Sequence, residues 1–455
     1  MTWRHSFRSI SARPLVRGSV LSILGNGVGR IGGLIVSIII AVQYGANLRT
    51  DRFYIVFSVV TFFLALFQGT LELAFIPVYS DVRWKDPSEK GRFLGALLLN
   101  ILLFTIGLGL LIDASAWYFL RFFWPNQSQD DLRLIASLVW EMSPLIVAAG
   151  VSAFFIALLN AEKCFMTAGL MPLLSSSGMI LFVLLLRERL EIHALSLGLV
   201  FGALVQISVM IVLFRRKQFR IEWNLNHPNL LRVSRLASLQ MVALLLASSI
   251  PVLDRVIVSY FLKEGSVTAI ENASRLCQIP WSFATVGYMN VFFSWWSHKS
   301  SEGDLPYVNS SFEKLFLLSF LVFLPVSLLL FLDSQPIVRL IFGYGKYSEG
   351  AVLSTSNVFG YYCLGYWAFM LRSTLVRFYS ARQSVSVVTQ AALLEFSVHF
   401  LTVFLLIGLT DVKSIGIGTT MGYFTSFTYL FVHYLRSRET SWAKEGLIFQ
   451  RLGKN

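Results

Sequence analysis

The feature that most constrains this chain is a series of apolar runs, most of them long enough to cross a ~30 Å hydrocarbon core as a helix of ~20 residues. The expected spans are 19–44, 53–80, 93–118, 132–159, 165–187, 193–214, 233–262, 267–297, 312–332, 351–376, 384–410 and 414–435. Hydrophobic residues make up 55% of the chain and charged residues 14%, as in integral membrane proteins. The pattern predicts an all-α integral membrane protein with about twelve transmembrane helices.

The loop charges predict an orientation. Of the 38 Lys and Arg residues, 24 fall in the loops that a cytoplasmic N-terminus would leave inside, and 10 fall in the outer loops. The positive-inside rule therefore places both termini in the cytoplasm. Residues 1–17 are basic and polar, so no cleavable signal peptide is expected. The net charge of +13 then reflects topology and anionic membrane lipids rather than nucleic acid.

The longest basic loop divides the spans into two sets of six. The predicted parts are a cytoplasmic N-terminus (1–18), a six-helix lobe (19–214), a cytoplasmic basic linker (215–232), a second six-helix lobe (233–435) and a cytoplasmic tail (436–455). Similar polar hairpins at Phe154–Leu174 and Thr374–Leu394 support an internal repeat. Two such lobes imply a pseudo-two-fold axis along the membrane normal and a central cavity. For the tail, an interfacial helix and a disordered segment are equal alternatives.

Arg30 lies near the middle of the first run, beside Gly29, Gly32 and Gly33. An arginine at this depth costs roughly 2.5–3.5 kcal/mol on insertion scales, so we expect it to face protein or water rather than lipid. One interpretation is a structural ion pair with a neighbouring group. We favour a binding role, because the glycines remove side-chain bulk where an anionic ligand would approach.

Asp51, in the turn between the first two spans, has two interpretations. Its carboxylate can pair with Arg49 or Arg52 when the outer side closes, which would make Asp51 and Arg52 parts of a gate. Asp51 can instead be the N-cap of the second helix, since aspartate before an apolar run is a good cap. The sequence favours neither.

Other ionisable residues also lie inside predicted spans. Asp254 and Arg255 are expected to form a local or inter-helix ion pair near the outer end of the seventh span. Glu395 and His399 are four residues apart, hence on one helix face, and would either bind a coupling proton or cation or form a satisfied core pair. The core pair is the favoured interpretation.

The chain shows no recognisable enzyme chemistry. It has no catalytic carboxylate pair, Ser/His/Asp set, phosphate-binding glycine loop or metal-ligand cluster, so neither an enzyme nor a cofactor is expected. Cys164, Cys277 and Cys363 are scattered through apolar segments and predict core residues without disulfides.

Short motifs along the chain resemble those of the MurJ/MviN family of bacterial lipid flippases. In the first two spans they are Arg30–Gly33 (R-x-x-G), Ala41–Ala46 (A-x-x-x-G-A), Thr50–Phe53 (T-D-x-F) and Ala74–Pro77 (A-F-[IV]-P). In the second half they are Ala273–Pro280, Phe342–Tyr347 and Phe378–Gln383. The resemblance covers nearly the whole chain, with twelve spans instead of the fourteen common in MurJ proteins.

The resemblance implies a flippase of the bacterial cytoplasmic membrane that carries a polyprenyl-diphosphate-linked saccharide by alternating access. Arg30 and Arg275 match basic positions of the family, and Arg372 falls where that family often has a basic residue. The planar fork of arginine suits a diphosphate. We therefore expect these three residues to bind the headgroup, although Glu271, one turn before Arg275, could pair with it. Glycosyltransferases or polymerases of the same pathway are candidate partners.

Three departures from the family pattern leave the glycolipid open between a murein precursor and an exopolysaccharide or O-antigen unit. Val36 stands where the family usually has a second arginine, Thr61–Leu66 replaces a basic pair, and Ser274 replaces an aspartate. One rival interpretation is a cation-coupled small-molecule or drug antiporter of the same superfamily, which would use buried carboxylates. The other is a non-transporting membrane scaffold or enzyme subunit whose arginines are structural.

Overall fold

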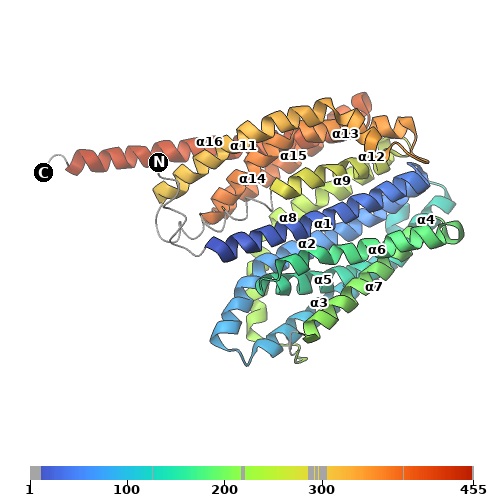
Figure 1. Cartoon of the computed structure of the whole chain (residues 1–455), viewed down its shortest axis with the longest axis horizontal. Helices are drawn as coiled ribbons and strands as arrows, with labels where there is room; N and C mark the ends of the chain where they lie inside the picture. Colours follow the sequence, from blue (N-terminus) through green and yellow to red (C-terminus); the bar gives the residue numbers. More distant parts are fainter. Residues whose placement is uncertain are drawn as a thin grey trace. The chain divides into compact units, whose positions relative to one another are not determined.

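The computed structural model describes residues 12–124, 127–216, 221–284, 292, 296, 305–382 and 384–452. These residues form α-helices joined by short turns, with no β-strand among them (Figure 1). They group into two compact units that we describe separately. Unit 1 comprises Met1–Gly287 and Gln335–Ser356, and unit 2 comprises Tyr288–Ser334 and Asn357–Asn455.

Unit 1 contains the first helices of the chain and the turns, predicted to lie on the outer side, that matter for the candidate site. Its helices are α1 (Ala12–Tyr44), α2 (Leu48–Lys85), α3 (Lys90–Phe123), α4 (Gln129–Met142), α5 (Pro144–Ala161), α6 (Phe165–Leu190), α7 (His193–Arg216), α8 (Pro228–Phe261), α9 (Ser266–Ala284) and most of α12 (Ser334–Phe342). Within this unit α2 packs on α5 and α8, and α1 packs on α6 and α9.

Unit 2 is built from later helices. They are α11 (Leu305–Leu332), the second half of α13 (Glu349–Leu364), α14 (Tyr366–Ala381), α15 (Val385–Thr410) and α16 (Lys413–Leu452). Its aromatic core joins Trp296, Phe312, Phe378 and Tyr434. Helix α16 runs on to Leu452, so the backbone of the tail is helical as far as that residue (Figure 1).

The all-helical membrane fold is confirmed. Nine helical stretches of the described chain are long and apolar enough to cross a membrane, with α4 and α5 together forming one of them. Of the remaining predicted spans, 351–376 corresponds to α13 with α14 and 414–435 to α16, and 267–297 corresponds to α9 as far as Ala284. Of residues 285–297, all but 292 and 296 lie outside the described part. The division into two six-helix lobes at residues 215–232 stays a prediction, and residues 217–220 of that linker lie outside the described part.

Two predicted single spans are each broken into two helices. Residues 132–159 contain the junction between α4 and α5 at Ser143, where Pro144 takes the first position of α5. Proline fits there because its missing N–H would have no intrahelical partner. Residues 351–376 contain a similar junction at Gly365, between α13 and α14.

Glycines set the close packing of neighbouring helices. A Cβ on Gly202 of α7 would lie 2.3 Å from the backbone oxygen of Ser175 on α6, and one on Gly178 would lie 2.4 Å from Gly202. In unit 2, Gly418 and Gly422 of α16 bring its backbone against α15 in the same way. Small residues four apart are a common solution for helices that associate in lipid, where no hydrophobic drive brings them together.

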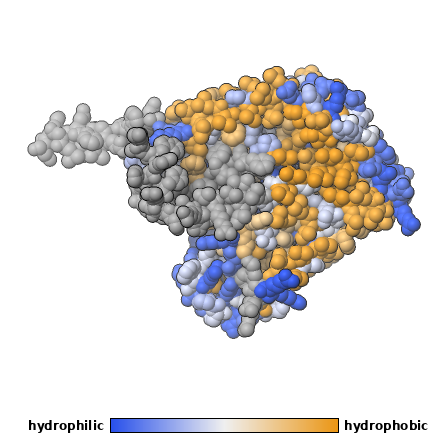
Figure 2. Space-filling model, viewed as in Figure 1, coloured by the Kyte–Doolittle hydropathy of each residue, from blue (hydrophilic) through white to orange (hydrophobic). Residues whose placement is uncertain are grey.

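The outward surfaces of the helices are apolar. Exposed leucines line α11 and α15 in unit 2, among them Leu321, Leu329 and Leu405. In unit 1 the same holds for α6, with Leu184 and Leu185. Figure 2 shows apolar side chains along the flanks of α11 and α6 and hydrophilic residues at helix ends. Such flanks fit contact with lipid tails.

The α6–α7 contact yields a direct test. Gly202→Ala should lower the melting temperature of the purified protein, because its methyl group would displace the α6 backbone at a cost of about 1–3 kcal/mol. Gly107→Ala on α3 is the matched control, since a Cβ there meets nothing within 4 Å. The control should melt at or slightly above wild type, because alanine favours helix more than glycine does. Equal melting of the two variants would contradict the packing described.

Candidate functional site

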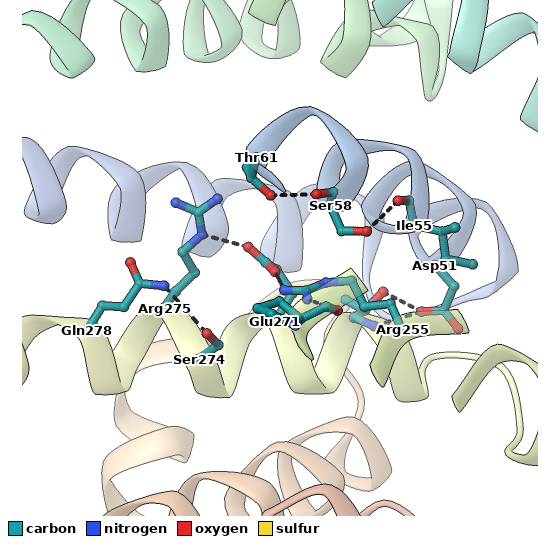
Figure 3. Close-up of polar contacts among 11 residues, drawn as sticks. Asp51, Ile55, Ser58, Thr61, Arg255, Glu271, Ser274, Arg275 and Gln278 are labelled. Carbon is teal, nitrogen blue, oxygen red and sulfur yellow. Dashed lines mark hydrogen bonds and ion pairs between the residues drawn. The ribbon is translucent and has the colours of Figure 1, made fainter. Parts of the chain in front are cut away.

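Three charged residues of α8 and α9, namely Arg255, Glu271 and Arg275, form one cluster in unit 1 (Figure 3). Nε of Arg275 donates to Oε1 of Glu271 at 2.7 Å, and the other oxygen of Glu271 pairs with Arg255 on α8. The expected pairing of Arg275 with Glu271 is therefore present. Arg255 thus forms an inter-helix ion pair with Glu271, and a pairing of Arg255 with Asp254 stays a prediction.

Arg30 faces the same region from α1. Its Nη1 donates to Oε1 of Gln278 on α9 at 3.0 Å, and it interacts electrostatically with Arg275. The side chain remains exposed, although Arg30 lies in the middle of a helix. Two arginines from α1 and α9 thus lie within electrostatic range of each other and repel, while the one carboxylate of the cluster, Glu271, pairs with Arg275 and Arg255.

The glycines beside Arg30 were expected to leave space for an anionic ligand, and this expectation is wrong for two of the three. A Cβ on Gly29 would lie 2.7 Å from the backbone oxygen of Gly169, and one on Gly32 would lie 2.4 Å from the side chain of Leu173. Both glycines therefore serve close packing of α1 on α6. Gly33 alone faces the cluster, with Nη1 of Arg275 3.1 Å from the position of its Cβ.

A small cavity of about 50 Å³ adjoins Arg275. Its lining includes Gly33 and Ser37 of α1, Phe57 of α2, Ser176 of α6 and Arg275 of α9. This volume admits a few waters at most, since each needs roughly 10–15 Å³ of such space. In this conformation the cavity can solvate a guanidinium group, but it does not hold a saccharide.

Asp51 does not cap the second helix. The N-cap of α2 is Asn47, whose side chain forms a capping box with Thr50. The carboxylate of Asp51 instead accepts hydrogen bonds at the start of α9, from the backbone N–H of Gly265 (2.7 Å) and Thr268 (2.8 Å) and from the Thr268 hydroxyl (2.6 Å). A carboxylate at a helix N-terminus satisfies donors that have no intrahelical partner and interacts favourably with the helix dipole.

The two arginines expected to pair with Asp51 pair elsewhere. Arg52 forms a bidentate ion pair with Asp131 of α4, at 2.9 and 2.6 Å, and both side chains are buried. Arg49 pairs with Glu191 at the α6–α7 turn, where both groups are largely exposed. In this conformation Arg52 therefore joins α2 to α4, and Asp51 joins α2 to α9.

Two turns of unit 1, predicted to lie on the outer side of the membrane, meet backbone to backbone. The N–H of Lys346 donates to the carbonyl of Val42 at 2.9 Å. Gly45 (φ +77°) and Gly345 (φ +61°) adopt left-handed conformations. A Cβ on Gly45 would lie 2.6 Å from the Lys346 carbonyl, and one on Gly345 would lie 2.5 Å from the Val42 carbonyl. Only glycine fits this contact. Together with the Asp51 contacts it is named the outer closure, after the side of the membrane on which the loop charges are predicted to place these turns.

Tyr347 completes the outer closure from the loop after α12. Its hydroxyl accepts from the amide of Asn272 on α9 at 3.1 Å and contacts the hydroxyl of Thr355. Burial raises the pKa of Tyr347 to about 12, so the phenol keeps its proton at neutral pH. The hydroxyl of Thr268 also lies 3.0 Å from that of Thr50. The outer closure is thus a polar contact between the α1–α2 turn and the start of α9.

The other predicted site residues lie in unit 2. Arg372 of α14 pairs with Glu395 of α15, and its Nε donates to the hydroxyl of Ser426 at 3.0 Å. His399 is buried, and its ring lies edge-on to Phe400. Glu395 therefore neutralises Arg372, one of the three arginines that were expected to bind the headgroup.

Carboxylates that an antiporter would use are also engaged. Glu72 accepts from the amides of Gln68 and Asn160. Glu141 contacts His193 at 2.7 Å and also accepts from a serine hydroxyl. In this conformation these groups make structural contacts.

Sequence reasoning missed the partners that come from distant helices. Asp131, Glu191 and Gln278 lie 79, 142 and 248 residues from the arginines they contact. The start of α9 offered one usable signal: its first turn contains no acidic residue, so its N–H groups need an acceptor from elsewhere.

Curated relatives of this chain are lipid flippases. It is 27% identical over 410 residues to "Probable lipid II flippase MurJ" of Thermotoga maritima. The aligned residues cover 90% of this chain and 83% of the relative. It is 26% identical over 394 residues to the protein of the same name from Buchnera aphidicola subsp. Acyrthosiphon pisum, with coverage of 84% and 75%.

Solved structures show the same fold. A structure titled "Lipid II flippase MurJ, inward closed conformation" matches 91% of this chain and 87% of its own, with a TM-score of 0.78 at 20% identity. An inward-facing multidrug resistance MATE family transporter of the MOP superfamily matches with a TM-score of 0.77 at 12% identity, over 95% and 99%. A family model described as lipid II flippase MurJ matches residues 40–451, and the chain therefore belongs to the MurJ family.

Proposed function

We propose that this protein is a flippase that moves a polyprenyl-diphosphate-linked saccharide across the bacterial cytoplasmic membrane by alternating access. The observation that carries the proposal is the pair of arginines, Arg30 on α1 and Arg275 on α9, in a chain of the MurJ family. The family name and the names of the relatives supply the cargo class. Both termini are proposed to lie in the cytoplasm.

The chemistry of the cargo explains why arginines suit this position. A diphosphate in hydrocarbon would cost many kcal/mol unless cations and hydrogen-bond donors replace its water. Guanidinium groups stay charged in that environment and offer paired N–H donors to phosphate oxygens. Arg30 is exposed and Arg275 is partly exposed, so both can meet a ligand. The lipid tail needs no carrier because it can remain in the bilayer.

The outer closure supports alternating access. Asp51, Gly45 and Val42 belong to the first predicted lobe, whereas Thr268 and Lys346 belong to the second. Their contacts join the two lobes on the predicted outer side. Release of a headgroup to the outer leaflet requires these contacts to break. Asp51 thus acts as part of an outer gate, while Arg52 braces α2 against α4.

A cation-coupled antiporter is the second candidate, favoured by the similarity to MATE transporters. It would need Glu72, Glu141 or Glu395 to exchange a cation with the substrate.

Murein precursor and exopolysaccharide units share the polyprenyl diphosphate, so the arginines suit either cargo. Binding measured separately with each lipid distinguishes the two cargoes. A scaffold would bind neither lipid.

Removing either arginine should abolish tight binding. Arg30→Ala and Arg275→Ala should each weaken binding of an undecaprenyl-diphosphate saccharide by roughly ten- to a hundredfold, the loss of one charge-assisted contact of ~1.5–3 kcal/mol. Arg30→Lys should be partly active, because lysine keeps the charge and loses the fork. Binding to purified protein is measured beside thermal melts.

The matched control is Arg133→Ala, at an exposed arginine of α4. It should bind and melt like wild type. Unchanged binding in the Arg30→Ala/Arg275→Ala double variant would end the proposal. Lower melting together with unchanged affinity would indicate structural arginines.

Asp51→Asn should weaken the outer closure. Both oxygens of Asp51 accept N–H donors, and asparagine replaces one acceptor with a donor and removes the charge at the start of α9, a loss of about 1–2 kcal/mol. We expect impaired transport and faster labelling of Ser37→Cys by an impermeant thiol reagent added outside. Asp130→Asn, whose carboxylate is 93% exposed, is the control. Normal transport and labelling in Asp51→Asn, with reduced melting, would leave Asp51 as a helix cap only.

A further inference from the structure

Glu271 lies at the centre of the charged cluster of unit 1 (Figure 3). Its side chain is 5% exposed, and its two oxygens serve two different arginines. Oε1 accepts from Nε of Arg275 on the same helix, and Oε2 pairs with Arg255 on α8. One buried carboxylate therefore ties the proposed headgroup arginine to a second helix.

Three contacts fix the guanidinium group of Arg275. Glu271 holds its Nε at 2.7 Å, the ring of Phe57 lies 5.3 Å from its Cζ, and Gly33 leaves the space that Nη1 needs. In Figure 3 the two terminal nitrogens point away from Glu271. Because the carboxylate engages Nε alone, the terminal nitrogens remain oriented as a fork on the side of the cavity.

Arg255 explains how Glu271 can stay in place when a ligand arrives. With Arg275 as its single cation, Glu271 would compete with an anionic ligand for the same guanidinium group. Arg255 is 7% exposed and also donates to the carbonyl of Pro251 one turn earlier. It supplies a second, fixed cation that keeps the buried carboxylate ionised and anchored to α8.

We propose that Glu271 is a positioning residue for the diphosphate, which holds Nε of Arg275 so that both terminal nitrogens face the ligand as one prearranged fork. This inference rests on the proposed function. The gain comes from preorganisation: an arginine that is already oriented loses less side-chain freedom on binding. Arg255 acts on the ligand only through Glu271.

A carboxylate beside a cation can also have the opposite effect. If Glu271 mainly repelled the ligand or competed for Arg275, its neutralisation would tighten binding. If it positions Arg275, its neutralisation loosens binding, because a neutral amide accepts a weaker hydrogen bond. The sign of the change in affinity for Glu271→Gln therefore decides between the two roles.

The test uses the full-length purified protein and undecaprenyl diphosphate as the probe. We expect Glu271→Gln to weaken binding about tenfold, the worth of one charge-assisted contact. Glu271→Asp, which keeps the charge, should recover part of the affinity. In an Arg275→Ala background, Glu271→Gln should cause no further loss, because its effect passes through Arg275. Tighter or unchanged binding by Glu271→Gln in the otherwise native chain would overturn the inference.

A second variant distinguishes a loss of binding from a folding defect. Glu271→Gln leaves Arg255 buried without its carboxylate, so Arg255→Met/Glu271→Gln removes both charges of that pair together. We expect this double variant to melt nearer to wild type while binding stays weak. Wild-type affinity in the double variant would overturn the inference and leave the proposed function intact. Absence of binding by wild type would instead overturn the proposed function, and the inference with it.

Discussion

The structure depends on one constraint: each ionisable side chain carried into a membrane-spanning bundle needs a partner. In this chain several of the partners come from another helix. Arg52 of α2 pairs with Asp131 of α4, and Arg255 of α8 pairs with Glu271 of α9. Each pair joins two helices that lack a hydrophobic reason to associate in lipid. These ion pairs therefore hold helices together, and close glycine contacts, such as that of Gly202 of α7 with α6, bring other helices together.

Arg30 departs from that constraint. Its partner is the neutral amide of Gln278, and it lies within electrostatic range of Arg275. Two like charges brought together without equal compensation store repulsion, which an anionic ligand would relieve. Helix α9 also takes part in the outer closure, where its first turn donates to Asp51 of α2. The proposed ligand site and the proposed gate thus share α9.

The sequence could predict the helices, the class of fold and the pairing of Arg275 with Glu271. These depend on local quantities, namely the length of apolar runs and the spacing of i, i+4 residues. The family resemblance, read from motifs such as Thr50–Phe53, is confirmed. The glycines of those motifs were harder to interpret, since the partner of Gly29 lies on another helix, 140 residues away in the chain.

Partners on distant helices could not be predicted, because local spacing in the sequence does not show which helices meet. Asp51 was expected to meet an adjacent arginine or its own helix, and its carboxylate instead reaches Thr268, 217 residues away. A polar group in a short turn has many possible partners nearby in the sequence, but tertiary packing can bring it next to a distant one. The departure at Ser274 has a comparable explanation: the carboxylate beside Arg275 comes from Glu271, one turn earlier on α9.

If the proposed flippase works by alternating access, the outer closure opens in every transport cycle. The hydroxyls of Thr50 and Thr268 lie 3.0 Å apart across it, so cysteines at both positions are within reach of a disulfide. In a background without Cys164, Cys277 and Cys363, oxidation of this pair should stop flipping of a polyprenyl-diphosphate saccharide in proteoliposomes, and a reductant should restore it. Undiminished flipping by the oxidised, cross-linked protein would contradict the account.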